Sequence, residues 1–294
     1  MSQHPGSGRL SVSIIGGGIA GLSAAAFLRK HAQLSITIYE RREAGFSETS
    51  AGIGVMKNGI AILKQLGIDR EEVRGVIAAG WRTYNLQEEE VSTSLAGDGP
   101  DGEGNVWAIF RQDLRDALLR IVEDVKGDEQ PVKVVYQSRV VGLDPEAGLV
   151  QFADGTSVKS DLIIGADGIH SIVRDAVIPS THPVPAPSGL SLYRFVLPMN
   201  TVKNAIGQDH EQPAMFDYSR GTFVIFIAAG DEGNRNVVMY PIRGYELMNI
   251  AFAVPDGILR DPDQLHYSWN ASGSKEEMIE ALRGFPDWLQ RVFR

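Results

Sequence analysis

The chain has 294 residues, of which 43% are hydrophobic and 22% are charged, and its formal net charge is −9. This length allows two domains or one large α/β unit, and the negative charge argues against nucleic acid as a partner. The sequence has no cysteine, which excludes disulfides and thiolate nucleophiles and fits a reducing, cytoplasmic location. The six histidines form no i, i+4 pair, so a histidine metal site is not expected.

The first organised stretch predicts a dinucleotide site. A β-branched run at 12–15 ends at Gly16-x-Gly18-x-x-Gly21, and a helical segment, a second strand-like segment and Glu40 follow. Gly16 suits the tight turn out of the strand, Gly18 lets a pyrophosphate approach the backbone, and Gly21 lets the helix pack closely. Glu40 lies where an acid accepts hydrogen bonds from an adenosine ribose. Chance spacing of glycines does not explain the strands and the acid, so we expect an FAD-like or NAD-like ligand.

The same stretch is apolar enough to imitate a signal peptide or a membrane span. Its run of three glycines and its dinucleotide context disfavour both interpretations, so no membrane span is expected.

Small residues at 51–54 would allow close approach to a flat or bulky group. Residues 58–66 predict a short helix, and 106–110 predict a strand. Arg111 then begins an amphipathic helix. An Arg at such a corner is usually a solvated or capping residue, although it can also reach a phosphate or a ribityl chain.

Three short strand-like segments, 132–136, 139–143 and 149–152, predict a β-meander inserted before the parallel sheet resumes at 161–164. The resumed strand is followed by Ala166-Asp167-Gly168. This order predicts a carboxylate at the carboxyl edge of the sheet, where ligands bind in doubly wound folds. A plain Asp-Gly turn is the simpler interpretation, but it does not explain the location.

The second part of the chain has a different pattern of predicted elements. The proline-rich stretch Pro179–Gly189 predicts a stiff linker. The strand-like segments after it are 190–197, 214–218, 222–228, 237–242 and 249–254. They predict an antiparallel sheet, and Ser274 with Glu277 predicts a capped helix near the end of the chain.

The predicted fold is therefore α/β, with a dinucleotide-binding domain that has a parallel sheet and an inserted β-meander, and with an antiparallel-sheet substrate domain. The predicted boundaries are 1–180 for the first domain, 181–270 for the second, and 271–294 for a helical segment that starts a return to the first.

Four features in this order resemble the FAD-dependent aromatic monooxygenases, particularly the salicylate hydroxylase-like branch. They are GGGIAGL at 16–22 with Glu40, AGI at 51–53 with Asn58, Arg111 ahead of its helix, and GADGIHSIVR at 165–174. The segments Tyr193-Arg194 and Tyr240-Pro241-Ile242-Arg243 also look like that branch.

The resemblance implies that Gly16, Gly18 and Gly21 hold the FAD pyrophosphate and that Glu40 holds the ribose. It places Ala51 and Gly52 near the isoalloxazine ring and Arg111 near the flavin phosphate or ribityl chain. Asp167 and Gly168 would border the flavin and the route of NAD(P)H. Arg194 and Tyr240 resemble the pair that orients the substrate, although both also suit ordinary strand positions.

By the same resemblance, NAD(P)H reduces the flavin, and a flavin hydroperoxide then hydroxylates a phenolic or polyketide-like small molecule with O2. No protein nucleophile is expected.

One departure matters. Family members return to the FAD domain with a Gly-Asp motif, and no such segment follows Val254 here. A truncated, non-catalytic relative with weak or no FAD binding is therefore the main alternative to an active monooxygenase. An NAD-dependent oxidoreductase is a third alternative, which fails to explain the Ala-Asp-Gly segment.

Overall fold

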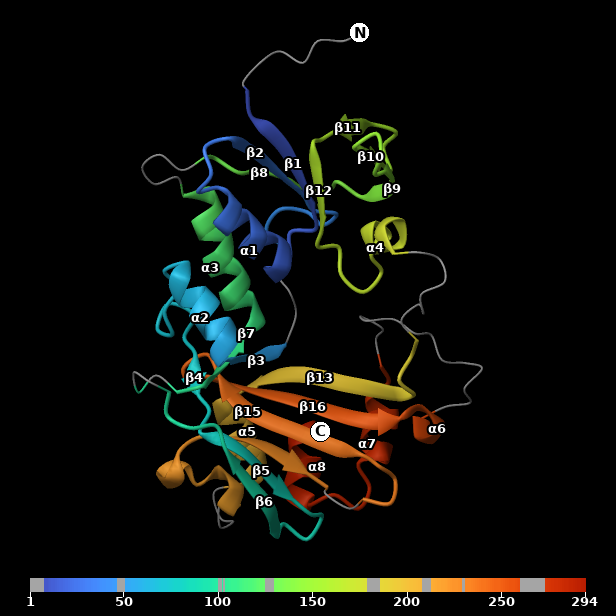
Figure 1. Ribbon diagram of the computed structural model, residues 1–294. Coiled ribbons are helices and arrows are strands. Elements are labelled where there is room, and N and C mark those ends of the chain that lie inside the picture. The colour runs from blue at the N-terminus through green and yellow to red at the C-terminus, as the bar shows by residue number, and fades with distance from the viewer. Residues whose placement is uncertain are drawn as a thin grey trace. The chain divides into compact units, whose positions relative to one another are not determined.

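The computed structural model describes residues 8–46, 51–99, 102, 104–124, 130–178, 186–207, 213–228, 231–259 and 273–294 (Figure 1). The chain folds into two compact units. The first unit consists of residues 1–47 and 114–185, and the second unit consists of residues 48–113 and 186–294.

The first unit is built on a parallel sheet with the strand order β12-β1-β2-β8 (Figure 1). Its strands are β1 (Leu10–Ile15), β2 (Leu34–Tyr39), β8 (Lys133–Val135) and β12 (Leu162–Gly165). Val12, Ile14 and Ile15 of the central strand β1 are buried, as expected of a parallel strand that is covered on both faces. Helix α1 (Ile19–Leu28) follows β1 and packs on β1 and β2. The predicted strand–helix–strand unit is thus confirmed.

The strand ends of this sheet are aligned. Ile15 pairs with Tyr39 and with Gly165, and Tyr39 pairs with Val135. Because the four strands run in the same direction, the residues that follow them meet at the carboxyl edge, where ligands bind in open α/β sheets. These residues are Gly16, Glu40, Tyr136 and Ala166.

The predicted β-meander is present in the first unit with two changes, because its third strand, β11, was not predicted and one predicted segment lies elsewhere. Strands β9 (Val140–Asp144), β10 (Leu149–Phe152) and β11 (Ser157–Lys159) form an antiparallel sheet in the order β11-β10-β9. The segment 132–136, expected as part of the meander, instead supplies β8 of the parallel sheet. Since the Glu40 N–H donates to the Val135 carbonyl oxygen, this segment continues the parallel ladder beside β2.

The second unit is built on a six-stranded sheet with the order β13-β16-β15-β14-β5-β6 (Figure 1). Its strands are β5 (Gly80–Tyr84), β6 (Glu90–Leu95), β13 (Leu190–Pro198), β14 (Phe223–Ile227), β15 (Asn236–Ile242) and β16 (Leu247–Pro255). The predicted antiparallel pairing is confirmed among β13, β16, β15 and β14. The hairpin of β5 and β6 was not predicted; its two strands pair antiparallel with each other, and β5 pairs in parallel with β14.

The predicted strand at 214–218 is wrong. This stretch contains the 3₁₀ helices η1 (Ala214–Phe216) and η2 (Tyr218–Arg220). The Phe216 N–H donates to the Pro213 carbonyl, and the Asp217 side chain accepts a hydrogen bond from the Ser219 N–H. Pro and Asp at these positions favour turns over a sheet ladder.

The main core of the second unit lies between one face of the six-stranded sheet and three helices. They are α5 (Met199–Ile206), α7 (Lys275–Ala281) and α8 (Asp287–Phe293). Phe252 of β16 is fully buried, and its ring packs edge-on against the rings of Phe285 and Phe293. The apolar stretch near residue 290 therefore belongs to this core. The short helix α6 (Asp256–Leu259) follows β16.

A smaller sheet completes the second unit. It consists of β3 (Gly52–Met56), β7 (Val106–Phe110) and β4 (Val76–Ile77), in that order. Helix α2 (Lys57–Gln65) follows β3, and α3 (Arg111–Glu123) follows β7. Buried Ala108 and Ile242 join this sheet to the six-stranded sheet, and an ion pair at 3.2 Å joins Arg243 to Asp113.

The predicted domain boundaries stay a prediction. Residues 48–113 pack in the second unit with residues 186–294, and most of the predicted linker lies outside the described residues. Among the helices of the described ranges, none has the length and apolar character needed to cross a membrane.

The loop between β14 and β15 holds the end of α7. All three side-chain nitrogens of Arg235 donate hydrogen bonds. Nε and Nη2 donate to the Asp231 carboxylate at 2.9 and 2.8 Å. Nη1 donates to the carbonyl oxygens of Ala281 and Arg283 at 2.6 and 3.0 Å. Carbonyls at a helix end have no partner within the helix, so Arg235 supplies one.

We expect Arg235→Ala to lower the free energy of unfolding by about 2 to 4 kcal/mol, because it removes the cation from a largely buried carboxylate, which keeps the hydrogen bond from the residue 235 N–H. Arg283→Ala is the control. Its side chain is 78% exposed and pairs with Glu280. The Arg283→Ala substitution should therefore lower the free energy of unfolding by less than about 1 kcal/mol. Urea unfolding of the three proteins measures the difference.

The effect should depend on pH. The Arg235 hydrogen bonds lower the pKa of Asp231, so their contribution is fully present above the usual aspartate pKa of about 3.9. It is lost as the pH falls through the lower pKa of the folded state. The difference in the free energy of unfolding between wild type and Arg235→Ala should therefore become smaller below about pH 4. A difference that does not depend on pH would contradict the role of this ion pair.

Candidate functional site

Two glycines of the N-terminal motif are required by packing within the first unit. Gly16 has a φ of +108°, and a Cβ atom there would lie 2.3 Å from the Ala166 carbonyl oxygen. A Cβ atom at Gly21 would lie 1.9 Å from the Gly16 carbonyl oxygen. The first glycine therefore lets β1 end against the segment after β12, and the third lets α1 approach β1 closely.

Gly18 is different. Its φ is −81°, which any residue adopts, and a Cβ atom there would meet nothing within 4 Å. Gly18 is also the N-cap of α1 and provides no side-chain hydrogen bond to the first turn. The N–H groups of that turn are therefore available to an anion. The protein itself does not require glycine here, whereas a pyrophosphate against this backbone would, so the loop fits a dinucleotide.

Glu40 ties the glycine loop to the end of β2. Its side chain is buried, and Oε2 accepts a hydrogen bond from the Gly17 N–H at 2.8 Å. Oε1 accepts one from the Arg42 N–H at 2.9 Å. Each carboxylate oxygen can accept a second hydrogen bond, so Glu40 retains capacity for a ribose hydroxyl beside the loop.

Asp167 organises its own turn at the same sheet edge. Its Oδ1 accepts from the Ser171 hydroxyl at 2.6 Å, and its Oδ2 accepts from the Ile172 N–H at 2.7 Å. Gly168 has a φ of +84°, which favours glycine. The two residues thus shape the turn into α4 (Ile172–Val177), which agrees with the simpler Asp-Gly turn interpretation. A ligand contact for them stays a prediction.

The second unit brings together Ala51, Gly52 and Arg111. The Arg111 N–H donates to the Ala51 carbonyl oxygen at 3.0 Å. Gly52, the first residue of β3, pairs with Phe110, the last residue of β7. A Cβ atom at Gly52 would lie 2.8 Å from Cε2 of Tyr240. Glycine is therefore needed where β3 meets the six-stranded sheet.

Arg194 and Tyr240 lie on the face of the six-stranded sheet opposite the main core. Tyr240 pairs with Asn249 and Arg194 pairs with Ala251, so the two side chains stand on the same face two residues apart in register. Burial raises the pKa of the Tyr240 hydroxyl to about 12, which keeps it protonated and able to donate. Burial also lowers the pKa of Arg194, so this partly buried cation would gain from an anionic ligand.

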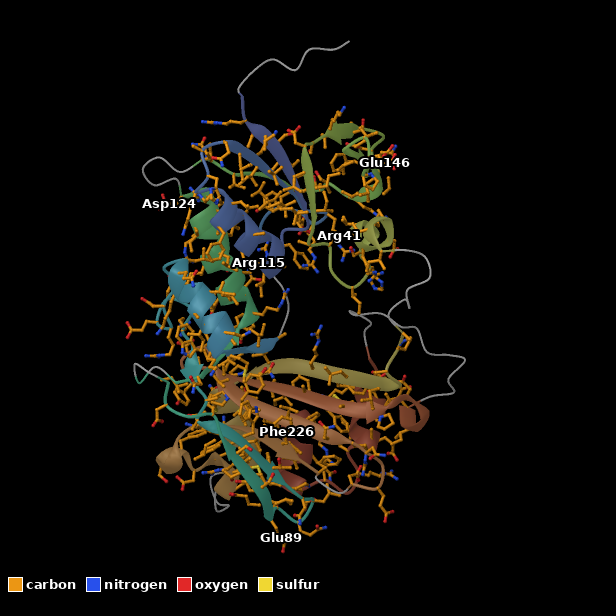
Figure 2. The ribbon with its side chains drawn as sticks, viewed as in Figure 1. Arg41, Glu89, Arg115, Asp124, Glu146 and Phe226 are labelled. Atoms are coloured by element: carbon orange, nitrogen blue, oxygen red, sulfur yellow. The ribbon has the colours of Figure 1, made fainter. Side chains whose placement is uncertain are left out.

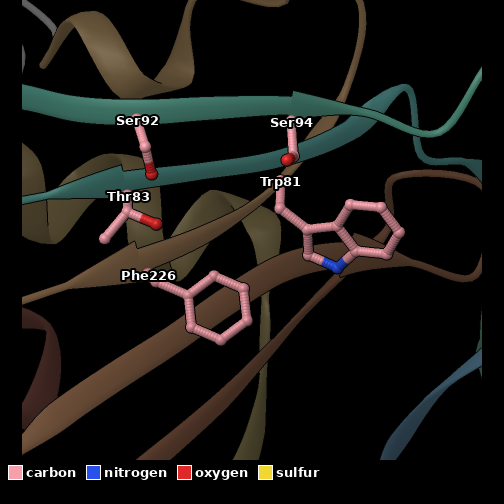
Figure 3. A pocket seen from close by; sticks show the side chains of 5 residues that line it. All are labelled: Trp81, Thr83, Ser92, Ser94 and Phe226. Carbon is pink, nitrogen blue, oxygen red and sulfur yellow. The ribbon is translucent and has the colours of Figure 1, made fainter.

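A pocket of about 330 Å³ opens on the same sheet face, lined by Trp81, Thr83, Ser92, Ser94 and Phe226 (Figure 3). Phe226 lies on β14 of the sheet (Figure 2). The registers align Thr83 with Phe226 and Trp81 with Val224. Trp81, Phe226 and Tyr240 all pack against one apolar cluster, so the aromatic wall of the pocket and Tyr240 share this part of the sheet face.

This pocket was not predicted from the sequence. Its local signal is the placement of Trp81 with Thr83 and of Ser92 with Ser94 at alternate positions of the β5–β6 hairpin. That alternation does not reveal that β5 lies beside β14, which is more than a hundred residues away in the sequence.

The predicted site residues thus form two groups. Gly16, Gly18, Gly21, Glu40, Asp167 and Gly168 lie in the first unit, and Ala51, Gly52, Arg111, Arg194 and Tyr240 lie in the second. The described residues contain no group of three or more His, Asp or Glu side chains that could hold a metal ion.

Comparison with known proteins identifies the family. The FAD binding domain family matches residues 9–188, which is more than half of the chain. The chain is 28% identical to hispidin-3-hydroxylase of Neonothopanus nambi, over 96% of this chain and 66% of that protein. It is 30% identical to 6-methylsalicylate 1-monooxygenase atA of Aspergillus terreus, over 83% of this chain and 54% of that protein.

A solved structure has the same fold. The crystal structure of CtdE in complex with FAD and a substrate aligns with a TM-score of 0.75 at 18% identity, over 97% of this chain and 66% of that one. The chain spans between about half and two thirds of the length of the curated relatives named above. The glycine loop, the acid after β2 and the family match agree, and the chain belongs to the FAD binding domain family.

Proposed function

We propose that this protein is an FAD-dependent monooxygenase that uses NAD(P)H and O2 to hydroxylate a phenolic, aromatic or polyketide-like small molecule. The observation that carries the proposal is the sheet face of the second unit, where an aromatic pocket, a half-buried tyrosine and a partly buried arginine stand on the same face. The names of the relatives, a hispidin hydroxylase and a 6-methylsalicylate monooxygenase, support an aromatic substrate.

In this proposal the first unit holds the adenosine and pyrophosphate of FAD. The backbone at Gly18 and the free first turn of α1 receive the phosphates, while Glu40 receives a ribose hydroxyl. Gly16 and Gly21 give the loop its shape, and Asp167 with Gly168 fixes the neighbouring turn. Ala51, Gly52 and Arg111 supply the flavin contacts of the second unit. The bound flavin supplies the redox chemistry with O2.

The side chains of the sheet face orient the substrate. A ring fits the apolar wall of Trp81 and Phe226, where aromatic contacts favour a stacked or edge-on ring. Arg194 pairs with a carboxylate or phenolate oxygen of the substrate, and the protonated Tyr240 hydroxyl donates a hydrogen bond. An ionised phenol is the more electron-rich substrate, so a cation at this position also favours the reactive form.

Gly18→Ala tests the proposed pyrophosphate contact. The new methyl group enters open space in the protein, so the melting temperature without FAD should stay unchanged. FAD affinity should fall roughly tenfold or more, about 1.4 kcal/mol, because the methyl group occupies the place of the phosphates. Fluorescence titration with FAD measures this.

Gly257→Ala is the matched control, because a Cβ atom there also meets nothing within 4 Å and its φ is not in the left-handed region. If Gly18→Ala bound FAD as tightly as this control, the pyrophosphate would not lie on Gly18.

Arg194→Ala tests the substrate role. Substrate-dependent NAD(P)H oxidation with salicylate-type phenols should fall by about tenfold or more, mainly through a higher KM, since a charge-assisted contact is lost. The flavin content should equal that of the wild type. Loss of flavin in this variant would instead make Arg194 a structural residue.

Formation of a hydroxylated product, detected by mass spectrometry with ¹⁸O₂, separates hydroxylation from idle NAD(P)H oxidation. NAD(P)H oxidation without product from any phenol would contradict the proposed reaction.

A further inference from the structure

Asn249 is a buried polar residue at the centre of the second unit. It lies on β16 between Met248 and Ile250, and only 4% of its surface is exposed. A buried amide is stable only when its polar atoms find partners. Its Oδ1 has one, because it accepts a hydrogen bond from the Gly52 N–H at 2.6 Å.

This bond fixes the orientation of the side-chain amide. A backbone N–H can only donate, so the atom that faces Gly52 must be the amide oxygen. The Nδ2 group, with two N–H donors, is therefore the other end of the side chain. Among the described residues, no atom accepts a hydrogen bond from Nδ2. The amide thus has donor capacity that the described part of the chain does not use, and Nδ2 is not one of the fully buried side-chain atoms that lack a partner there.

The registers put Asn249 between the two predicted substrate residues. Asn249 pairs directly with Tyr240 on β15 and with Val196 on β13. Arg194 is two residues from Val196 on the same strand, so its side chain stands on the same face. Directly opposed side chains have Cβ atoms about 5 Å apart, and diagonal neighbours about 7 to 8 Å. Tyr240, Asn249 and Arg194 therefore form a compact polar group on one sheet face.

We infer that Asn249 is a substrate-positioning residue with two tasks, an inference that rests on the proposed function. Its Oδ1 fixes Gly52, and with it the start of β3. Its Nδ2 donates a hydrogen bond to an oxygen on the aromatic substrate, the phenolate or an adjacent carboxylate, which Arg194 and Tyr240 also contact.

The chemistry of the three side chains favours this assignment. An anionic oxygen accepts several hydrogen bonds, and donors around it stabilise its charge. A neutral amide adds a donor without the desolvation cost of a second buried cation. A ligand that lacks the oxygen would leave Nδ2 without a partner, and such sites discriminate strongly against the poorer ligand.

Asn249→Asp separates the two tasks. The aspartate keeps an oxygen that can accept from the Gly52 N–H, but it replaces the NH2 donor with a second oxygen. With FAD-saturated protein, calorimetric titration with salicylate should show affinity reduced about tenfold or more. FAD affinity should stay within about twofold of the wild type. Asn249→Leu, which removes both ends of the amide, should weaken FAD and salicylate binding together.

Asn236→Asp is the matched control. It makes the same chemical change on β15, opposite Ala253 at the far end of the strand from Tyr240, and it should leave salicylate affinity unchanged. If Asn249→Asp fails to fold, salicylate titration of FAD-saturated Asn249→Ala carries the test, because alanine removes the Nδ2 donor and adds no charge. A salicylate affinity equal to that of the wild type would overturn the donor role.

The outcomes are distinct. If the wild type and Asn249→Asp bind salicylate equally, the donor role is wrong while the proposed function stands. If Asn249→Asp loses FAD as well as salicylate, Asn249 acts through Gly52 alone and the inference is overturned. If the FAD-saturated wild type binds neither salicylate nor 6-methylsalicylate, the proposed aromatic site fails, and the role of Asn249 falls with it.

Discussion

The close approach of backbone segments at the end of β1 is the constraint on which the first unit depends. A side chain at Gly16 would collide with the Ala166 carbonyl, and one at Gly21 would collide with the Gly16 carbonyl. Because glycine has no side chain, β1, α1 and the segment after β12 can approach one another closely at these two positions. The convergence aligns four strand ends at one edge and leaves the first turn of α1 without a side-chain cap. Gly18 and Glu40 then face that edge as a result of packing, and the ligand site follows from the fold.

In the second unit, the two faces of the six-stranded sheet differ in polarity. One face is covered by α5, α7 and α8 and carries the main apolar core. The other face is mixed. It carries the polar side chains of Arg194, Tyr240 and Asn249 and the aromatic side chains of Trp81 and Phe226. Buried polar groups in such a place are costly unless they are paired. The hydrogen bond from Gly52 to Asn249 is therefore both a structural link and the feature that orients the polar group.

Local patterns were sufficient to predict the β1–α1–β2 part of the first unit and the acid that follows it. The glycine spacing, the alternating strand and Glu40 are all contained in about thirty residues, so periodicity and turn chemistry reveal them. Arg194 and Tyr240 were predicted from the family resemblance alone, because isolated strand residues carry no local signal of function.

The remaining features depend on pairings between distant segments. The Trp81 pocket exists because β5 pairs in parallel with β14, and Asn249 gains its role from a backbone group nearly two hundred residues away. The segment 132–136 became a parallel strand because it lies next to β2, although its own sequence suits a hairpin equally well. The 3₁₀ turns after Pro213 show the opposite case, in which local turn residues outweighed strand propensity.

The proposed function depends on the binding of FAD by the glycine loop and Glu40. The most direct measurement is the visible absorption spectrum of the purified protein after incubation with FAD and passage through a desalting column. We predict a retained flavin spectrum, shifted from that of free FAD, at close to one flavin per chain. A colourless protein that takes up no FAD would contradict the proposed function and would favour the non-catalytic alternative.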